Sequence, residues 1–316
     1  MLARLFNNLT VQSLTSSLLV SYLLAGIAVF MRTYEPATLV LPGWSFTVSP
    51  TVFQWAAMIC LPLYSVWFNS ILIRFGFLKG HHHLIPIFTI LLLLFGCHEN
   101  QPAALAAIPL LILIIRQTLR MINAGAEVLQ LVFNIGFLIG VVSIFFPPGL
   151  ILTLVCWVAV VFFGHFSVRT IIIPIMGMAS FYFLVYSAYF FFTDFPFPAE
   201  LWSLLTQFSL NTWNGELHKT WPYLFLLISV LISLIEYVKA LNYAKIQKRQ
   251  FLNFNAAFLV LGIIAFAAFQ SPWAGGVIIA LPISVFLSNL VQYVSRWWLR
   301  DLIYLSLLLT LLLMVF

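Results

Sequence analysis

The chain has 316 residues, of which 63% are hydrophobic and only 7% are charged. Soluble domains carry roughly 25% charged residues, so this chain lacks the charge to cover a water-exposed surface. The composition therefore excludes an ordinary soluble domain and is typical of a protein whose solvent is largely lipid.

The net charge of +6 does not indicate nucleic-acid binding, because the basic residues stand singly between apolar runs. That spacing is typical of positively charged loops that anchor membrane helices on the cytoplasmic side. The three cysteines, Cys60, Cys97 and Cys156, lie in or beside apolar runs. Their spacing matches neither a disulfide framework nor a zinc site, so we expect free thiols.

Long apolar runs predict an all-α, polytopic transmembrane bundle that forms a single membrane domain over residues 1–316. Crossing a bilayer takes about 20 apolar residues at a rise of about 1.5 Å each. The first run is longer than the core of a signal peptide, so we expect an uncleaved span. The short runs 84–97 and 103–115 are predicted to cross, with a re-entrant pair as the alternative. The eleven predicted spans are 11–31, 50–73, 84–97, 103–115, 127–146, 149–164, 170–192, 222–239, 253–270, 274–294 and 302–316.

The distribution of charge supports eleven crossings with a cytoplasmic N-terminus and a periplasmic C-terminus. With that topology, the inner segments hold twelve of the fourteen Lys and Arg residues, and every inner loop holds at least one. The outer segments hold only Arg32 and Lys219, together with five of the eight acidic residues. A missed or extra span would scramble this alternation, so the positive-inside rule favours it.

Two predicted outer connections are long, and neither resembles a soluble domain. In residues 32–49, Trp44, Phe46 and Val48 alternate with polar residues, which predicts a short extended stretch against the membrane. In residues 193–221, the apolar spacing over 199–210 predicts a helix that lies on the outer leaflet. Function usually concentrates in such longer connections.

The candidate site residues all belong to the predicted outer face. Glu35 follows the first span, and the tight second outer turn carries His98 and Glu99. Carboxylate and imidazole groups can act as a general base or hold a divalent cation, although no cofactor is identified. Arg32 and Lys219 could hold a phosphate, with His218 as an auxiliary group. Ordinary polar loop residues are the alternative interpretation.

Other polar residues favour structural roles. The run from His81 to His83 is predicted as a solvated inner loop, with a weak metal site or headgroup contact as the alternative. Asn69 and Asn134, inside predicted spans, are expected to form hydrogen bonds between helices. The chain contains no nucleotide-binding loop, no HExxH and no GxSxG. Nucleotide-driven chemistry is therefore not expected.

The loop pattern and three segments resemble the fold-C (GT-C-like) glycosyltransferases. The segments are 135–140 (IGFLIG), the Phe146-Pro147-Pro148 turn and the entry into the seventh span over 169–174. The chain also resembles a group of bacterial inner-membrane proteins of similar length. The resemblance covers about residues 10–240 and leaves 241–316 as additional C-terminal spans. It implies an enzyme that takes a sugar from a polyprenyl-phosphate donor at the outer face.

The resemblance assigns the role of base to Glu35 and a supporting role to Glu99. The family usually carries an Asp or an acidic pair soon after the first span, whereas this chain has Tyr34-Glu35-Pro36. That departure leaves both an active enzyme and a non-catalytic relative open.

Three functions follow as hypotheses. The first is envelope glycoconjugate assembly by sugar transfer from a polyprenyl-phosphate donor in the bacterial inner membrane. The second is a non-catalytic scaffold subunit of an envelope-assembly or secretion complex. The third is a lipid or solute transporter, which the scarcity of charged groups within the spans disfavours. The expected partners are membrane lipid, such a lipid-linked sugar and membrane proteins, but no nucleic acid.

Overall fold

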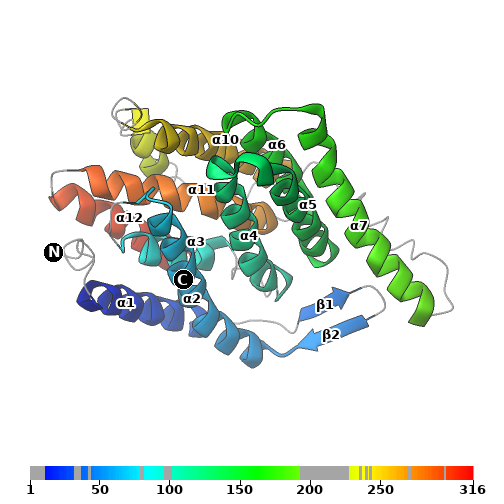
Figure 1. The fold of residues 1–316 in the computed structure, drawn as a ribbon. Helices are drawn as coiled ribbons and strands as arrows, with labels where there is room; N and C mark the ends of the chain where they lie inside the picture. The colour runs from blue at the N-terminus through cyan, green and yellow to red at the C-terminus, as the bar shows by residue number, and fades with distance from the viewer. Residues whose placement is uncertain are drawn as a thin grey trace.

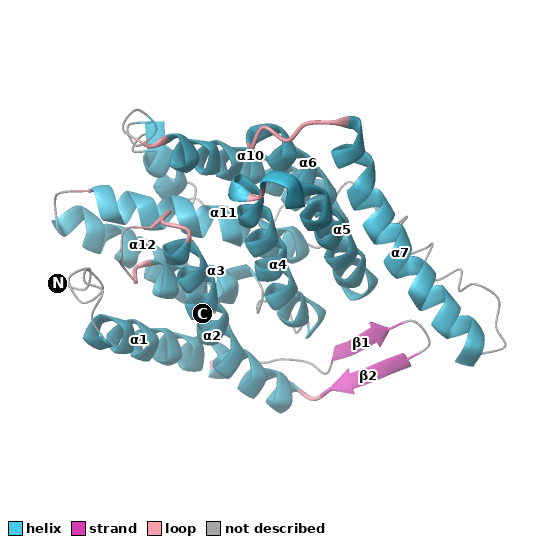
Figure 2. Cartoon of the chain, in the orientation of Figure 1, coloured by secondary structure: helices cyan, strands magenta, loops and turns pink. Residues whose placement is uncertain are grey.

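Apolar helices dominate a computed structural model of the chain (Figure 1). The described residues are 11–31, 37–41, 44–78, 82–95, 102–192, 228–234, 237–238, 241, 244–268, 272–294 and 297–315. Figure 2 shows that helices make up nearly all of the described chain, with one pair of strands.

Within the described residues, six helical segments are long and apolar enough to cross a membrane, as the sequence predicted for these regions. They are Ser13–Phe30, Pro50–Arg74, Pro102–Asn123, Gly125–Ile144, Val168–Ala188 and Ile246–Phe266. Three shorter apolar helical segments are Leu84–Phe95, Pro147–Phe162 and Gly276–Gln292. The chain is therefore described as a helical membrane protein, and the count of eleven crossings stays a prediction.

The helices are α1 (Val11–Phe30), α2 (Pro50–Arg74), α3 (Leu84–Phe95), α4 (Pro102–Arg120), α5 (Val128–Phe145), α6 (Leu152–Phe162), α7 (Val168–Phe192), α10 (Ile246–Ala268), α11 (Pro272–Tyr293) and α12 (Trp297–Val315). Residues 228–234 are also helical. Short 3-10 turns are η2 (Met121–Asn123), η3 (Gly125–Glu127) and η4 (Pro147–Ile151).

Helix α3 forms the centre of the bundle. All of its residues are buried, and it contacts α1, α2, α11 and α12 (Figure 1). Its 12 residues correspond to a length of about 18 Å, shorter than the hydrocarbon core of about 30 Å. All residues of α3 except Thr89 are apolar, and the Thr89 hydroxyl donates a hydrogen bond to Ser65 Oγ at 2.9 Å. Such a helix belongs to a protein core and not to a surface.

The first long connection forms a β-hairpin. Strand β1 (Ala37–Leu41) pairs antiparallel with β2 (Trp44–Val48), and Leu41 lies opposite Trp44. The extended stretch predicted at Trp44–Val48 is thereby confirmed. Strand β1 contacts α4 and α5, and the hairpin lies at the end of the bundle where α4 begins and α5 ends (Figure 1).

Helix α2 links the hairpin to the opposite end of the molecule. It begins after Ser49, whose hydroxyl accepts a hydrogen bond from the Val52 backbone N–H at 3.4 Å. Pro50 takes the first helical position, where its missing N–H costs nothing. The 25 residues of α2 span about 37 Å, so Arg74 lies about a membrane's width along the helix from the hairpin.

At that opposite end, several connections hold one another in place. The Gln247 side chain donates to Asn123 Oδ1 at 2.8 Å, which joins the start of α10 to η2. His165 Nε2 lies 2.8 Å from the Met121 carbonyl, which joins the α6–α7 connection to the same turn. Connections that the charge pattern assigned to one side of the membrane therefore meet at one end of the bundle. We call it the basic end, since Arg74, Arg116 and Arg120 lie there.

Helices α5 and α7 pack with unusually close backbones. A Cβ added to Gly136 would lie 2.0 Å from the Pro174 carbonyl oxygen, and one added to Gly177 would lie 2.3 Å from the Phe133 carbonyl oxygen. Gly136 and Gly140 form a GxxxG spacing, which lets membrane helices approach closely. The glycines thus determine how α7 docks on the rest of the bundle.

Candidate functional site: an arginine groove between α2 and α4

The site residues predicted from the sequence lie outside the described residues. They are Arg32, Glu35, His98, Glu99, His218 and Lys219. The predicted surface helix over 199–210 lies there as well. Along the chain, the described element nearest to Glu35 is β1, which begins two residues after it, and the one nearest to Glu99 is α4, which begins three residues after it.

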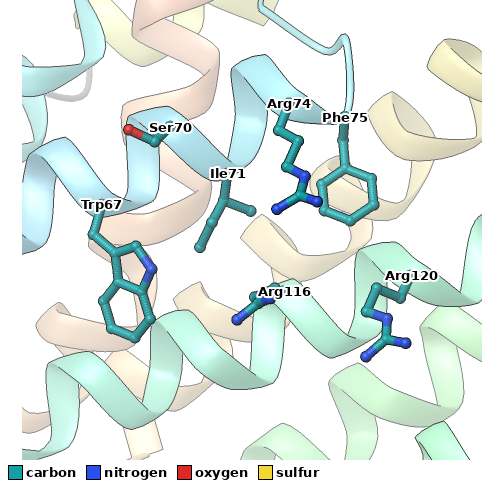
Figure 3. Close-up of a pocket in the computed structure, with 7 residues that line it drawn as sticks. All are labelled: Trp67, Ser70, Ile71, Arg74, Phe75, Arg116 and Arg120. Carbon is teal, nitrogen blue, oxygen red and sulfur yellow. The ribbon is translucent and has the colours of Figure 1, made fainter.

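A different polar site lies within the described chain, at the basic end. A groove of about 630 Å³ runs between the last turns of α2 and α4 (Figure 3). Its lining combines three arginines with two aromatic rings, a hydroxyl and one aliphatic side chain. These residues are Trp67, Ser70, Ile71, Arg74, Phe75, Arg116 and Arg120.

Helical periodicity explains why these residues share one surface. On α2, successive intervals of three, one and three residues separate Trp67, Ser70, Ile71 and Arg74, which places them on one face. On α4, Arg116 and Arg120 are four residues apart and share a face in the same way. Because α2 and α4 contact each other, the two faces converge on one groove.

The groove is strongly positive. All three arginines are exposed, and no carboxylate within the described ranges forms an ion pair with any of them. The one hydrogen bond from their guanidinium groups to another side chain of the described residues runs from Arg120 Nη1 to Gln117 Oε1, at 3.3 Å. In Figure 3, Arg74 and Phe75 extend from α2 toward α4, which supplies Arg116 and Arg120.

The helix ends stabilise this positive charge. Arg74 and Arg120 lie in the last turns of α2 and α4, where the partial negative charge of the helix dipole favours a cation. A guanidinium group presents a planar fork of N–H donors that matches the oxygens of a phosphate or carboxylate. The arrangement can therefore bind a multiply charged anion at the membrane boundary.

This groove was not predicted from the sequence. From charge placement alone, Arg74, Arg116 and Arg120 were expected only to anchor loops and set the topology. The sequence does show that Trp67 and Arg74 share one face of a predicted helix and that Arg116 and Arg120 share one face of another. The contact between α2 and α4 could not be read from either segment alone.

The prediction of a solvated histidine loop is wrong for two of its three residues. His82 and His83 are buried, and His83 is fully so. His82 Nδ1 lies 3.1 Å from Asn69 Nδ2, and His83 Nδ1 lies 2.9 Å from the Tyr304 hydroxyl. A polar group in an apolar interior needs such a partner, and Asn69 inside an apolar span was the signal for one. The bond of Asn69 therefore links α2 to the residue pair before α3, and not to another helix as predicted. The described structure gives the Asn134 side chain no hydrogen bond, so the prediction is not confirmed there either.

Metal ligands do not gather in the described part of the chain, where no group of three His, Cys, Asp or Glu side chains is close enough to hold an ion. The described cysteines, Cys60 and Cys156, are free, as expected. The predicted divalent cation would belong to residues outside the described ranges, so that prediction stays open.

One family matches nearly the whole chain. Residues 13–316 match a family described as "Family of unknown function (DUF6427)". No curated protein and no solved structure matches the chain.

Proposed function

The chain belongs to the DUF6427 family, and we propose that this membrane protein binds phosphate-bearing groups in the groove between α2 and α4. One observation supports the proposal above all others. Three guanidinium groups line one groove, and no carboxylate of the described chain pairs with them. Clustered like charges repel one another, and a bound anion removes that repulsion while gaining charge-assisted hydrogen bonds.

We test this proposal by replacing Arg116 and Arg120 together with glutamine. We expect inorganic pyrophosphate to raise the unfolding temperature of the detergent-purified protein, because a ligand of the folded state stabilises it. The double variant should lose most of this shift. Arg169→Gln, an exposed arginine at the same end but outside the groove, should keep it. An equal shift in all three proteins would refute phosphate binding in the groove.

We further propose a role in envelope glycoconjugate assembly in the bacterial inner membrane, with sugar transfer from a polyprenyl-phosphate donor. The resemblance to fold-C glycosyltransferases and the contact of β1 with α4 and α5 support this role. Strand β1 begins just after Glu35, and α4 begins just after Glu99. The contacts of β1 therefore bring the segment after Glu35 beside both α4 and the next helix, α5. In this proposal Glu35 takes the proton from an acceptor hydroxyl, while Arg32 and Lys219 hold the donor phosphate.

Glu35→Gln tests the catalytic role. The variant should lose transfer by at least about 100-fold, the usual contribution of a general base, while folding normally. The measurement is incorporation of labelled sugar from a polyprenyl-phosphate donor in isolated membranes. Glu200→Gln changes a second predicted outer carboxylate and should leave transfer intact. Full activity of Glu35→Gln would remove this residue as the base.

A further inference from the structure

We infer that the ligand of the arginine groove is a membrane lipid whose headgroup ends in a phosphomonoester or diphosphate, with its hydrocarbon chain lying along α2. The inference rests on the proposed phosphate binding and names the class of ligand. It depends on how the groove joins the lipid-facing surface of the helix.

An apolar stripe of α2 leads directly into the groove. Val52, Trp55, Ile59 and Leu63 recur at intervals of three or four residues, and each is between 49% and 60% exposed. The same helical spacing, continued toward the end of α2, reaches Ser70 and Arg74, which are also exposed. The stripe and the cationic end therefore occupy one face of one helix.

The lengths along α2 match half a bilayer. Leu63 and Arg74 are eleven residues apart, which corresponds to about 16 Å along the helix axis. Half of the hydrocarbon core measures about 15 Å. With Arg74 at the depth of the headgroups, Leu63 lies near the middle of the bilayer. A lipid tail that runs from the groove along α2 toward Leu63 therefore stays in one leaflet of the bilayer and follows one face of the helix.

Helix α4 supplies the second flank of this path. Ala106 is exposed, and Leu110 and Leu113 are half-buried. These residues precede Arg116 and Arg120 at the spacing of one helix face. The groove therefore opens sideways toward lipid as well as toward water, which suits a ligand that enters from the membrane plane.

The charge of the groove selects the headgroup. A phosphodiester carries one negative charge and would leave two of the three guanidinium charges unbalanced. A phosphomonoester carries about 1.5 to 2 negative charges at neutral pH, and a diphosphate carries more. Bidentate binding by a guanidinium group needs free terminal oxygens, and a phosphomonoester or diphosphate has more of these than a phosphodiester. Trp67 adds an amphipathic ring of the kind that favours the membrane interface.

The experiment compares two lipids that have the same tails but different headgroups, and a phosphate compound that has no tail. The purified full-length protein in a neutral detergent is titrated with phosphatidic acid, phosphatidylglycerol or glycerol 3-phosphate, and bound ligand is counted by native mass spectrometry. We expect phosphatidic acid to bind at least tenfold more tightly than either of the others. The variant Arg116→Gln/Arg120→Gln should lose at least tenfold in affinity for phosphatidic acid, while Arg169→Gln should not.

A second pair of variants tests the path of the tail. Ile59→Ser/Leu63→Ser changes the stripe, and Val260→Ser/Ile264→Ser makes the same change at equally exposed positions four residues apart on α10. The α2 pair should weaken phosphatidic acid binding and leave the effect of pyrophosphate on the unfolding temperature unchanged. The α10 pair should weaken neither.

The outcomes separate the two levels of the proposal. If pyrophosphate stabilises the protein but phosphatidic acid binds no better than glycerol 3-phosphate, the groove takes a free phosphate compound and the lipid inference is wrong. If phosphatidylglycerol binds as tightly as phosphatidic acid, the assignment of the headgroup is wrong. If no phosphate compound binds, both the lipid inference and the proposed function fail.

Discussion

His83 is fully buried, and the hydroxyl of Tyr304 lies 2.9 Å from its Nδ1. The two residues are separated by 221 positions in the sequence, so this one contact joins the start of α3 to α12. Sequence patterns alone could not reveal it, because no local periodicity records a contact over that separation.

Tyr304→Phe removes this hydrogen bond while keeping the ring. We expect a loss of about 1 kcal/mol in the free energy of unfolding, the typical net value of one hydrogen bond. The measurement is denaturant or thermal unfolding of the purified protein in detergent. Tyr22→Phe is the matched control, since the described structure gives the Tyr22 hydroxyl no hydrogen bond. Equal stability of both variants would show that the His83 contact contributes nothing.

The spacing of Arg116 and Arg120 predicts part of the groove but not the whole of it. Their spacing of four places both on one face of α4, which the sequence states directly. The groove also needs Arg74 from α2, and that contribution depends on how two helices pack. The sequence therefore shows that Arg116 and Arg120 share a face, but not that this face lines a groove with Arg74.

At the scale of elements, the glycines of α5 and α7 set the closest helix contact for which the structure gives a distance. Gly136→Ala would place a methyl group 2.0 Å from the Pro174 carbonyl oxygen, so one of the helices must move. We expect a loss of about 1–3 kcal/mol in stability, as for other overpacked sites. Thermal unfolding and the elution profile on size exclusion measure the effect.

Gly26→Ala is the control for this prediction. A Cβ at Gly26 would lie 3.8 Å from Met58 Cε, which is an ordinary contact. Alanine also favours a helix over glycine by up to about 1 kcal/mol, so Gly26→Ala should be neutral or stabilising. Destabilisation by Gly26→Ala as large as that by Gly136→Ala would contradict the close approach of α5 and α7.

Helices were predictable from composition because an apolar run of sufficient length has no other stable form in lipid. The extended stretch at Trp44–Val48 was also predictable, since its side chains alternate with a period of two. Its pairing partner, β1, was not, because Ala37–Leu41 has no such alternation. Pairing depends on the turn that brings the strands together.

For the whole molecule, the hairpin and the basic end should lie on opposite sides of the membrane. We place single cysteines at Thr47 and Ala126 in a chain whose three native cysteines are replaced by alanine. A membrane-impermeant maleimide should label Thr47→Cys in intact cells and Ala126→Cys only after lysis. These residues are exposed in β2 and η3, respectively. Labelling of both positions without lysis would overturn the opposed arrangement.

The alternation of charge along the chain predicts which connections share a side of the membrane. Three of these connections, η2, the α6–α7 connection and the start of α10, contact one another, while their side of the membrane stays a prediction. The arrangement of helices around α3 was beyond prediction. Every residue of α3 except Thr89 is apolar, so hydropathy cannot distinguish a helix that faces lipid from one enclosed by other helices.

The enclosure of α3 has a consequence for how the protein is made. The ribosome releases α3 long before α11 and α12, yet those late helices cover part of its surface. In the nascent chain, the surface of α3 that α11 and α12 cover therefore stays exposed until these last helices are synthesised and inserted. Chains truncated before α11 should expose α3 and become substrates for membrane proteases, although α1, α2 and α4 to α7 are complete.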